Sequence, residues 1–445
     1  MNDSFEPRSY GAVADGHSKD TAAVQAAIDA AAAQGGTVRL AGGTFVCGTL
    51  YLKSNVALEI TNSATLLASP DIADYGTDTH HNRYRNEPEL DRCFLFAQDA
   101  ENVTICGSGV IDGNAAAFPN AGSIYRPMLL RVLRCRNVRV TGLRLLNAAA
   151  WTTAFLDSDF IWATDLHIEN HRNYNGDGLD FDGCRHVWVR GCYSDGTDDN
   201  LCLQSSGLPV QDVHISDCAF TSVCAGIRIG LKSIGEISGV VISNCTMRNV
   251  WREGIKLECT EGGSITDVLV ENVAMHNVRR PIFAILNNRY RPDDLGSSVE
   301  LDHIPPIGIM ARLRFVGITA VDDEEMAHTQ RRFDNDIMGE PKFGGCRFDA
   351  NAAHPIEDVT IRDFRYTAIG GVRLADLPAA PYPEVPDRLQ APTAPGSENY
   401  YPNWSRTTHL DARNVRGLTL ENLRFTTLHS DERPKMLTEG PTVML

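Results

Sequence analysis

The chain has 445 residues, with 41 Lys or Arg against 57 Asp or Glu, so its formal net charge is −16. This charge argues against a nucleic-acid-binding protein, which needs basic side chains to neutralise phosphates, and against a polybasic membrane-surface protein. A hydrophobic content of 43% is ordinary for a globular protein. The sequence contains no apolar run of about 18 residues, so we predict no transmembrane helix.

The N-terminus shows no basic stretch followed by an apolar one, so we expect no signal peptide. A cytoplasmic location follows as an expectation, with secretion as the alternative if an export signal precedes this sequence. In a reducing compartment the 12 cysteines would be buried thiols. None of them forms a C-x-x-C pair or has the spacing of a zinc site.

The first predicted element is a helix over residues 20–34, an alanine-rich segment. Asp20 or Thr21 can cap its start, and the pair Gly35-Gly36 can end it. An amphipathic helix ahead of a stack of strands would cover the open end of that stack. We therefore predict an N-terminal cap over about residues 1–45.

After the cap, a short pattern of alternating branched apolar residues followed by polar turn residues recurs. It begins at Val138, Leu166, Val187, Val213, Val240 and Val268, at intervals of 28, 21, 26, 27 and 28 residues. Each copy predicts a short strand that buries alternate residues, and a repeat of about 20–30 residues is typical of one coil of a solenoid. A helical array would instead show apolar faces of period 3.6.

Extra length interrupts this repeat at about residues 76–98, 287–312, 322–356 and 366–414. Insertions of this kind usually form loops on one face of a solenoid, often the binding face. We therefore predict a single all-β domain over residues 1–445, and not the three domains that the length suggests.

The densest group of carboxylates falls on consecutive predicted coils. Asp177 and Asp198 are 21 residues apart, about one short coil, so stacking would bring Asp177 near the pair Asp198-Asp199. Clustered carboxylates repel one another. A proton shared among them would supply both an acid and a base, as glycosidic bond cleavage requires. Ordinary turn residues and a calcium site are the alternatives.

The segment Asn175-Gly176-Asp177-Gly178-Leu179-Asp180 resembles the N-T-D-G-[I/L]-D signature of glycoside hydrolase family 28, the polygalacturonase family, and residues 196–203 resemble its G-D-D-C-I-A-L segment. Other segments similar to pectin-lyase-like β-helices are residues 10–16, 42–45 and 107–113. The resemblance implies a right-handed parallel β-helix that hydrolyses its substrate with inversion. It also implies that Asp198 is the general acid, that Asp177 and Asp199 activate the attacking water, and that no metal or organic cofactor is needed.

Two segments depart from the family pattern. Ala225 stands where the family has a His, and Arg228 replaces a small residue, so that it could contact a substrate oxygen or pair with a carboxylate. Lys256 and Glu258 stand at the Arg and Lys positions of the R-I-K segment that binds galacturonate. Lys lacks the bidentate fork of Arg, and Glu repels a uronate. These changes favour a neutral or deoxy sugar such as rhamnose, and a Lys256–Glu258 pair is the alternative.

Further candidate substrate-binding residues surround the acidic motif. Trp151 and Tyr174 are possible stacking platforms for a sugar ring, Asn175 and His171 could line a subsite, and His171 could replace the missing imidazole. We predict an inverting hydrolase of a pectin-related or other plant or microbial glycan, exo-acting if the loops close one end of the cleft. A non-catalytic carbohydrate-binding β-helix, and a lyase or epimerase on the same fold, are the alternatives.

Overall fold

The computed structural model describes residues 4–79, 90–119, 126–289, 301–328, 343–379, 381–382, 385, 404–439 and 442–444. The chain divides into two compact units, Met1–Asp198 (unit 1) and Asp199–Leu445 (unit 2). Parts of all four predicted loop insertions, among them residues 80–89 and 329–342, lie outside the described residues. The single domain over residues 1–445 stays a prediction.

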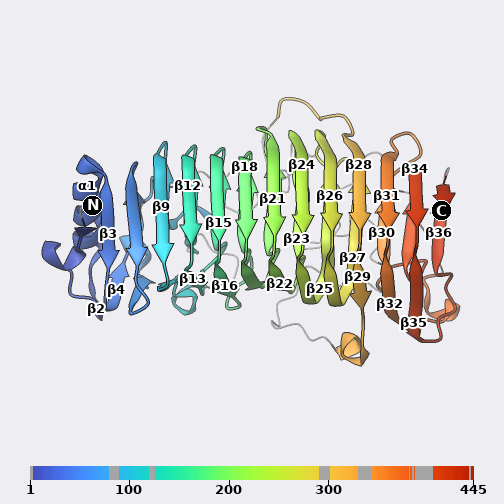
Figure 1. Ribbon diagram of the computed structural model, residues 1–445, viewed down its shortest axis with the longest axis horizontal. Helices are drawn as coiled ribbons and strands as arrows, with labels where there is room; N and C mark the ends of the chain where they lie inside the picture. Colours follow the sequence, from blue (N-terminus) through green and yellow to red (C-terminus); the bar gives the residue numbers. More distant parts are fainter. Residues whose placement is uncertain are drawn as a thin grey trace. The chain divides into compact units, whose positions relative to one another are not determined.

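Unit 1 consists of three parallel ladders of short strands (Figure 1). The first ladder contains β1 (Ser4–Phe5), β3 (Gly36–Leu40), β6 (Val56–Ile60), β9 (Glu101–Gly107), β12 (Arg136–Thr141), β15 (Asp159–Thr164) and β18 (Arg185–Arg190). The second contains β2 (Asp15–Lys19), β4 (Gly43–Cys47), β7 (Ala64–Ala68), β10 (Val110–Asp112), β13 (Arg144–Leu146), β16 (His167–Asn170) and β19 (Tyr193–Gly196). The third contains β5 (Leu50–Leu52), β8 (Cys93–Gln98), β11 (Met128–Leu133), β14 (Thr153–Leu156) and β17 (Leu179–Asp182).

The core of unit 1 lies between these ladders, where like residues stack in register. Val138, Ile161 and Val187 are aligned partners on β12, β15 and β18, and each is fully buried. Phe155 on β14 stacks on Phe181 on β17, with ring centroids 5.0 Å apart. The spacing matches the separation of hydrogen-bonded strands, about 4.8 Å. The alternating pattern of the sequence therefore becomes columns of buried side chains.

One copy of the repeat occupies a different ladder from the others. The pattern that begins at Leu166 lies in β16, on the second ladder, whereas those at Val138 and Val187 lie on the first. The first-ladder strand of that coil is β15, which contains Phe160 and Trp162 beside its buried Ile161. Aromatic residues at the outward positions made this strand hard to recognise from a pattern of branched apolar residues.

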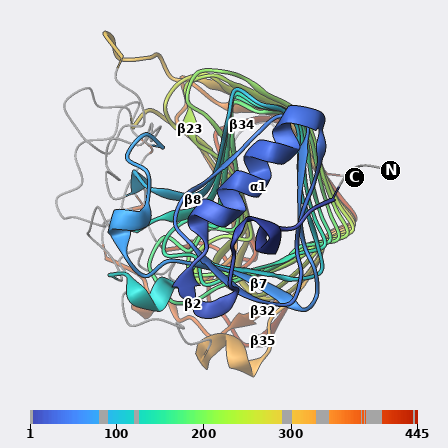
Figure 2. The ribbon, with the colours of Figure 1, turned by 90° about the vertical axis from the view of Figure 1, so that its left-hand side faces the viewer.

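Helix α1 (Thr21–Gln34) packs on β3 and β5 at the N-terminal end of unit 1 (Figure 2). It buries Val24, Ala27, Ile28 and Ala31. The carboxylate of Asp20 does not cap the helix, because it accepts hydrogen bonds from the amides of Val13 and Ala14 at 2.7 and 3.0 Å. Gly35 ends the helix with its amide donating to the carbonyl of Ala31. The predicted helix is confirmed, but the Asp20 carboxylate binds a preceding loop and does not cap the helix.

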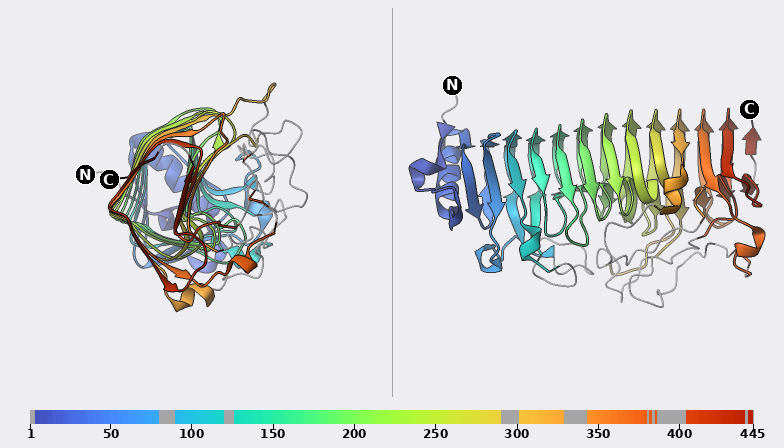
Figure 3. Two further views of the ribbon diagram at one scale, coloured as in Figure 1. Left: turned by 90° about the vertical axis from the view of Figure 1, so that its right-hand side faces the viewer. Right: turned by 90° about the horizontal axis from the view of Figure 1, so that it is seen from below.

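Unit 2 repeats the three-ladder arrangement (Figure 3). The first ladder contains β21 (Val210–Ser216), β24 (Glu236–Ser243), β26 (Ser264–Glu271), β28 (Ile309–Val316), β31 (Ile356–Arg362), β34 (Val415–Glu421) and β37 (Thr442–Met444). The second contains β22 (Ala219–Ser222), β25 (Thr246–Cys259), β27 (Ala274–Leu286), β29 (Thr319–Val321), β32 (Arg365–Gly370) and β35 (Arg424–His429). The third contains β20 (Leu201–Ser205), β23 (Ile227–Ser233), the same β25 and β27, β30 (Cys346–Asp349), β33 (Leu410–Arg413) and β36 (Met436–Glu439).

Each unit is thus a parallel β-helix, which confirms the predicted fold class. Short 3-10 helices lie outside the ladders, namely η1 (Pro7–Tyr10), η2 (Ile72–Asp74), η4 (Ala115–Ala117), η5 (Glu324–His328) and η6 (Leu374–Asp376). Eleven of the 12 cysteines are buried. Within the described part of the chain, no helix is both long and apolar enough to cross a membrane.

Unit 2 contains a buried carboxyl group that titrates near neutrality. Asp322 follows β29, is 4% exposed and accepts a hydrogen bond from the amide of Ile369 at 3.1 Å. Burial raises the pKa of Asp322 to about 7, and the nearby Arg279 and Tyr366 offset only part of this effect. The fold therefore keeps a proton on Asp322 over a pH range in which the unfolded chain has lost it.

The contribution of Asp322 to stability is expected to fall as the pH rises from about 4 to 8, because the folded state binds the Asp322 proton more tightly than the unfolded state. The difference between the ordinary pKa of 3.8 and about 7 corresponds to roughly 4 kcal/mol. Asp322→Asn, which stays neutral, should remove this part of the pH dependence in urea unfolding measured at pH 5 and pH 8. Exposed Asp358→Asn is the control. Identical pH dependence in wild type and Asp322→Asn would contradict the prediction.

Candidate functional site

The three candidate catalytic aspartates fall on both sides of the division between the units. Asp177 and Asp198 belong to unit 1, and Asp199 begins unit 2. All three are buried, with exposed fractions of 2%, 4% and 0%. Buried carboxylates are costly unless hydrogen bonds or opposite charges stabilise them, so the groups around each one decide its protonation.

The loop that carries Asp177 is fixed by the hydroxyl of Thr197. This hydroxyl accepts a hydrogen bond from the amide of Gly176 at 2.9 Å and donates to the carbonyl of Asn173 at 2.6 Å. The carbonyl of Asp177 accepts from the amide of Thr152 at 2.9 Å, just before β17 begins. Backbone and side-chain hydrogen bonds thus hold the residue on both sides of its Cα.

Gly176 leaves no room for a side chain. A Cβ at this position would lie 2.3 Å from the Thr197 Oγ1 and 2.7 Å from the carbonyl oxygen of Asn170. Gly176→Ala is expected to cost about 1–3 kcal/mol of stability and to lower activity by displacing Asp177. Thermal melts and kcat measurements check this. The control for activity is Gly42→Ala, where an added Cβ meets nothing within 4 Å but the φ of 63° strains a side chain. It should cost stability and leave kcat unchanged, and an equal loss of kcat in the two variants would contradict the displacement of Asp177.

Arg126 holds the same loop from a distant part of unit 1. It is fully buried, and one guanidinium nitrogen donates to the Asn175 Oδ1 at 2.8 Å while another donates to the carbonyl of Tyr174. Asn175 has a φ of 56°, a left-handed conformation that Asn tolerates. The predicted subsite residues Asn175 and Tyr174 therefore shape the loop. No local signal in the sequence points to Arg126, which lies 49 residues before Asn175.

Two other predicted residues of unit 1 have structural neighbours. The His171 Nε2 lies 3.4 Å from the Oδ2 of Asp195, a carboxylate that is itself buried. Trp151 is 3% exposed and packs in an apolar cluster with Met128 and Leu133. This packing explains the burial of Trp151 without any bound sugar. A substrate-binding role for His171 or Trp151 stays a prediction.

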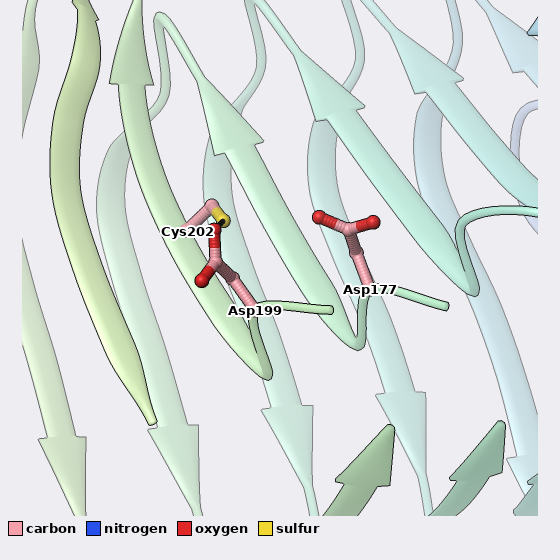
Figure 4. A group of neighbouring side chains, drawn as sticks. All are labelled: Asp177, Asp199 and Cys202. Carbon is pink, nitrogen blue, oxygen red and sulfur yellow. Dashed lines mark hydrogen bonds between the residues drawn. The ribbon is translucent and has the colours of Figure 1, made fainter. Parts of the chain in front are cut away.

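Asp199 is paired with a cation and held by a backbone amide. Its Oδ2 lies 2.6 Å from a guanidinium nitrogen of Arg228, and its Oδ1 accepts from the amide of Ala225 at 3.0 Å. The Cys202 Sγ is 3.8 Å from the same Oδ2; Figure 4 shows Asp199 and Cys202, and also draws Asp177 of unit 1. Of the two alternatives left open for Arg228, the structure shows the pair with a carboxylate.

The surroundings of Asp199 keep it ionised. Burial by itself disfavours the charge, but the positive charges of Arg228 and Lys256 and the hydrogen bonds from Cys224 and the Ala225 amide outweigh it, so the pKa of Asp199 is lowered. The backbone register explains the contact, since Cys202, Arg228 and Lys256 are aligned partners on β20, β23 and β25. A carboxylate that stays ionised can act as a base but not as an acid.

Lys256 lies between two carboxylates. Its Nζ is 3.5 Å from an oxygen of Glu258 and 3.7 Å from an oxygen of Glu253, and all three residues are at least 98% buried. Burial opposes the charge of Lys256, but Glu258 and Glu253 outweigh it and raise its pKa. The predicted alternative, a Lys256–Glu258 pair, is present in the structure.

Glu253 belongs to the same ion cluster, although its position in the sequence did not single it out. Burial opposes its charge, but Arg252, Lys256 and Arg280 outweigh it and lower its pKa. Arg252 and Arg280 lie 3.6 and 3.5 Å from its carboxylate oxygens. The sequence does contain one signal for the ion cluster: Glu253 stands three residues before Lys256 in one long strand, β25.

Residues 44–302, more than half of the chain, match the model of glycosyl hydrolases family 28. The chain belongs to this family. A probable polygalacturonase of Vitis vinifera is 26% identical over 262 residues, which cover 52% of each protein. The exo-poly-alpha-D-galacturonosidase of Dickeya chrysanthemi is 25% identical over 243 residues, which cover 43% of this chain and 40% of the relative. This family 28 chain thus spans about half the length of the curated relatives it matches.

The solved structures support the same fold. An exopolygalacturonase of Thermotoga maritima superposes with a TM-score of 0.65 at 20% identity, covering 82% of this family 28 chain and 87% of that one. The architecture is therefore a right-handed parallel β-helix. The assignment of Asp177, Asp198 and Asp199 to the catalytic signature of the family, and of Ala225, Lys256 and Glu258 to departures from it, stays a prediction from the sequence.

Proposed function

We propose that this family 28 chain hydrolyses an O-glycosidic bond, with inversion, in a pectin-related or other plant or microbial glycan. The bond cleaved would belong to a neutral or deoxy sugar such as rhamnose. The observation that carries this proposal is the pairing of Lys256 with both Glu253 and Glu258. Glu258 brings a negative charge beside Lys256, and this charge opposes a uronate.

In the proposed reaction Asp198 donates its proton to the leaving oxygen as the glycosidic C–O bond breaks. A water molecule attacks the anomeric carbon from the opposite face, and its proton passes to Asp177 or Asp199. Because the new C–O bond forms opposite the one that breaks, the anomeric configuration inverts. The Arg228–Asp199 pair supports this division of roles, since it keeps Asp199 available as a base.

The charges of unit 2 support a neutral sugar at the cleaved bond. A uronate carboxylate near Lys256 would meet Glu258, whose oxygen lies 3.5 Å from the lysine, and like charges at that distance repel. Arg252 and Arg280 offset the charge of Glu253, so the argument depends on Glu258. Glu258 can instead accept hydrogen bonds from sugar hydroxyls. The exo action of two similar proteins makes end-on cleavage the form of the reaction that we propose.

A panel of glycans tests the proposal: rhamnogalacturonan, xylogalacturonan, homogalacturonan and neutral plant glycans, each assayed for new reducing ends. We expect rhamnogalacturonan or a neutral glycan to have the highest kcat/KM, and proton NMR of the first product to show the inverted anomer. Homogalacturonan as the best substrate would overturn the choice of sugar. Mid-length products early in digestion would overturn exo action, and retention of configuration would overturn the mechanism.

A further inference from the structure

Gln204 carries a buried amide that the described residues leave without a hydrogen-bond partner. It lies in β20, is 1% exposed, and neither its Nε2 nor its Oε1 bonds to any residue in the described part of the chain. Leaving such a group buried without a partner destabilises the fold. An apolar residue of similar size would avoid this cost, so the amide points to a bound ligand as its partner.

The direction of the amide follows from the strand. Leu203 is fully buried in the core, and Cys202 stands on the opposite face, where its Sγ lies 3.8 Å from Asp199. Since side chains alternate along a strand, Gln204 shares the face of Cys202 and lies about 7 Å farther along. Gln204 therefore lies on the same face of β20 as the Cys202 Sγ that contacts Asp199.

The neighbouring strand, β23, bulges opposite this amide. The register of β20 and β23 shifts between Leu203 and Ser205, so that the segment Gly230–Lys232 bulges against Gln204. Gly230 has a φ of 96°, and a Cβ there would lie 2.2 Å from the carbonyl oxygen of Glu258. No side chain can therefore stand at this position. Bulges of this kind are frequent beside active sites.

Glu258 is the aligned partner of Gly230 on the next strand, β25. Along the stack of coils the order is thus an amide, a glycine and a carboxylate, with the outer two strands about 10 Å apart. The amide offers two donors and an acceptor, and the carboxylate offers acceptors. Adjacent hydroxyls of a sugar ring both donate and accept, whereas a uronate carboxylate would meet Glu258 with like charge.

We propose that Gln204 and Glu258 form two sides of a subsite, with the side-chain-free Gly230 between them, that binds adjacent hydroxyl groups of a neutral sugar ring. This inference rests on the proposed function and names the group that selects the sugar. Gln204 binds and orients the ring next to the bond cleaved, and it takes no part in proton transfer.

The test compares Gln204→Leu with wild type on a rhamnogalacturonan oligosaccharide, with an oligogalacturonate as the uronate substrate. We expect the KM for the rhamnogalacturonan oligosaccharide to rise about 5- to 100-fold, the equivalent of the lost hydrogen bonds, with an unchanged or higher melting temperature. The matched control is Asn287→Leu, which removes another fully buried amide of unit 2 that bonds to none of the described residues. Its KM should stay near that of wild type.

Three outcomes would overturn the subsite: an unchanged KM in Gln204→Leu, an equal rise of KM in both variants, or an equal rise on both substrates. A lower melting temperature with an unchanged KM would show that the amide is structural, and also counts against it. If wild type cleaves none of the glycans, the proposed function fails. If wild type cleaves rhamnogalacturonan and Gln204→Leu does so equally well, only this inference fails.

Discussion

Asp198→Asn is expected to lower kcat on the order of 10³-fold, because Asn cannot give a proton to the leaving oxygen. The substitution keeps the size of the side chain, so the melting temperature should stay close to that of wild type. Reducing-end assays on the best glycan of the panel measure the loss. A substrate with an activated aryl leaving group, which departs without a proton, should recover much of the rate if Asp198 is the acid.

The matched control is Asp165→Asn, an isosteric change at an exposed turn residue of unit 1 with a φ of 54°, which Asn adopts readily. It should leave kcat unchanged. Full activity of Asp198→Asn would refute the assignment of the acid. If the activated leaving group does not restore the rate, Asp198 acts as the base and another residue must be the acid.

Much of the fold could be predicted because successive coils of a β-helix repeat the same residue pattern along the sequence. Branched apolar residues at alternate positions, as around Val138 and Val187, predict buried columns, and the structure has them on β12 and β18. The same rule found the strand at Leu166 but not its ladder, since the first-ladder strand β15 carries Phe160 and Trp162 in place of branched residues. Periodicity specifies that coils exist, but not which ladder each segment joins.

The site was only partly predictable, for a related reason. The family signature marks aspartates by their order in the chain, yet it does not show what neutralises them. The choice between substrate contact and ion pairing for Arg228 depended on side-chain directions, which only the register of β20, β23 and β25 supplies. Arg126 was missed because its role comes from contacts that no short pattern encodes, and the subsite that we propose for Gln204 has no local signal either.

The second large effect is expected for Arg228→Leu, which leaves the Asp199 carboxylate fully buried without its 2.6 Å partner. Removal of one member of a buried ion pair typically costs about 3–5 kcal/mol. The lowered pKa of Asp199 means that this pair stabilises the fold above the unfolded pKa, and that the contribution is lost as the pH falls through the folded pKa. Arg228→Leu should therefore be least stable, relative to wild type, at neutral pH.

The same change should alter the pH dependence of catalysis. Without Arg228 the pKa of Asp199 rises, so the acid limb of the kcat/KM profile moves to higher pH, while Arg228→Lys, which keeps the charge, should move it less. If Arg228→Leu is too unstable to assay, the double variant Asp199→Asn/Arg228→Leu should regain stability, because neither charge is then left buried alone. An unmoved acid limb in a folded Arg228→Leu protein would show that Arg228 does not hold Asp199 as the base.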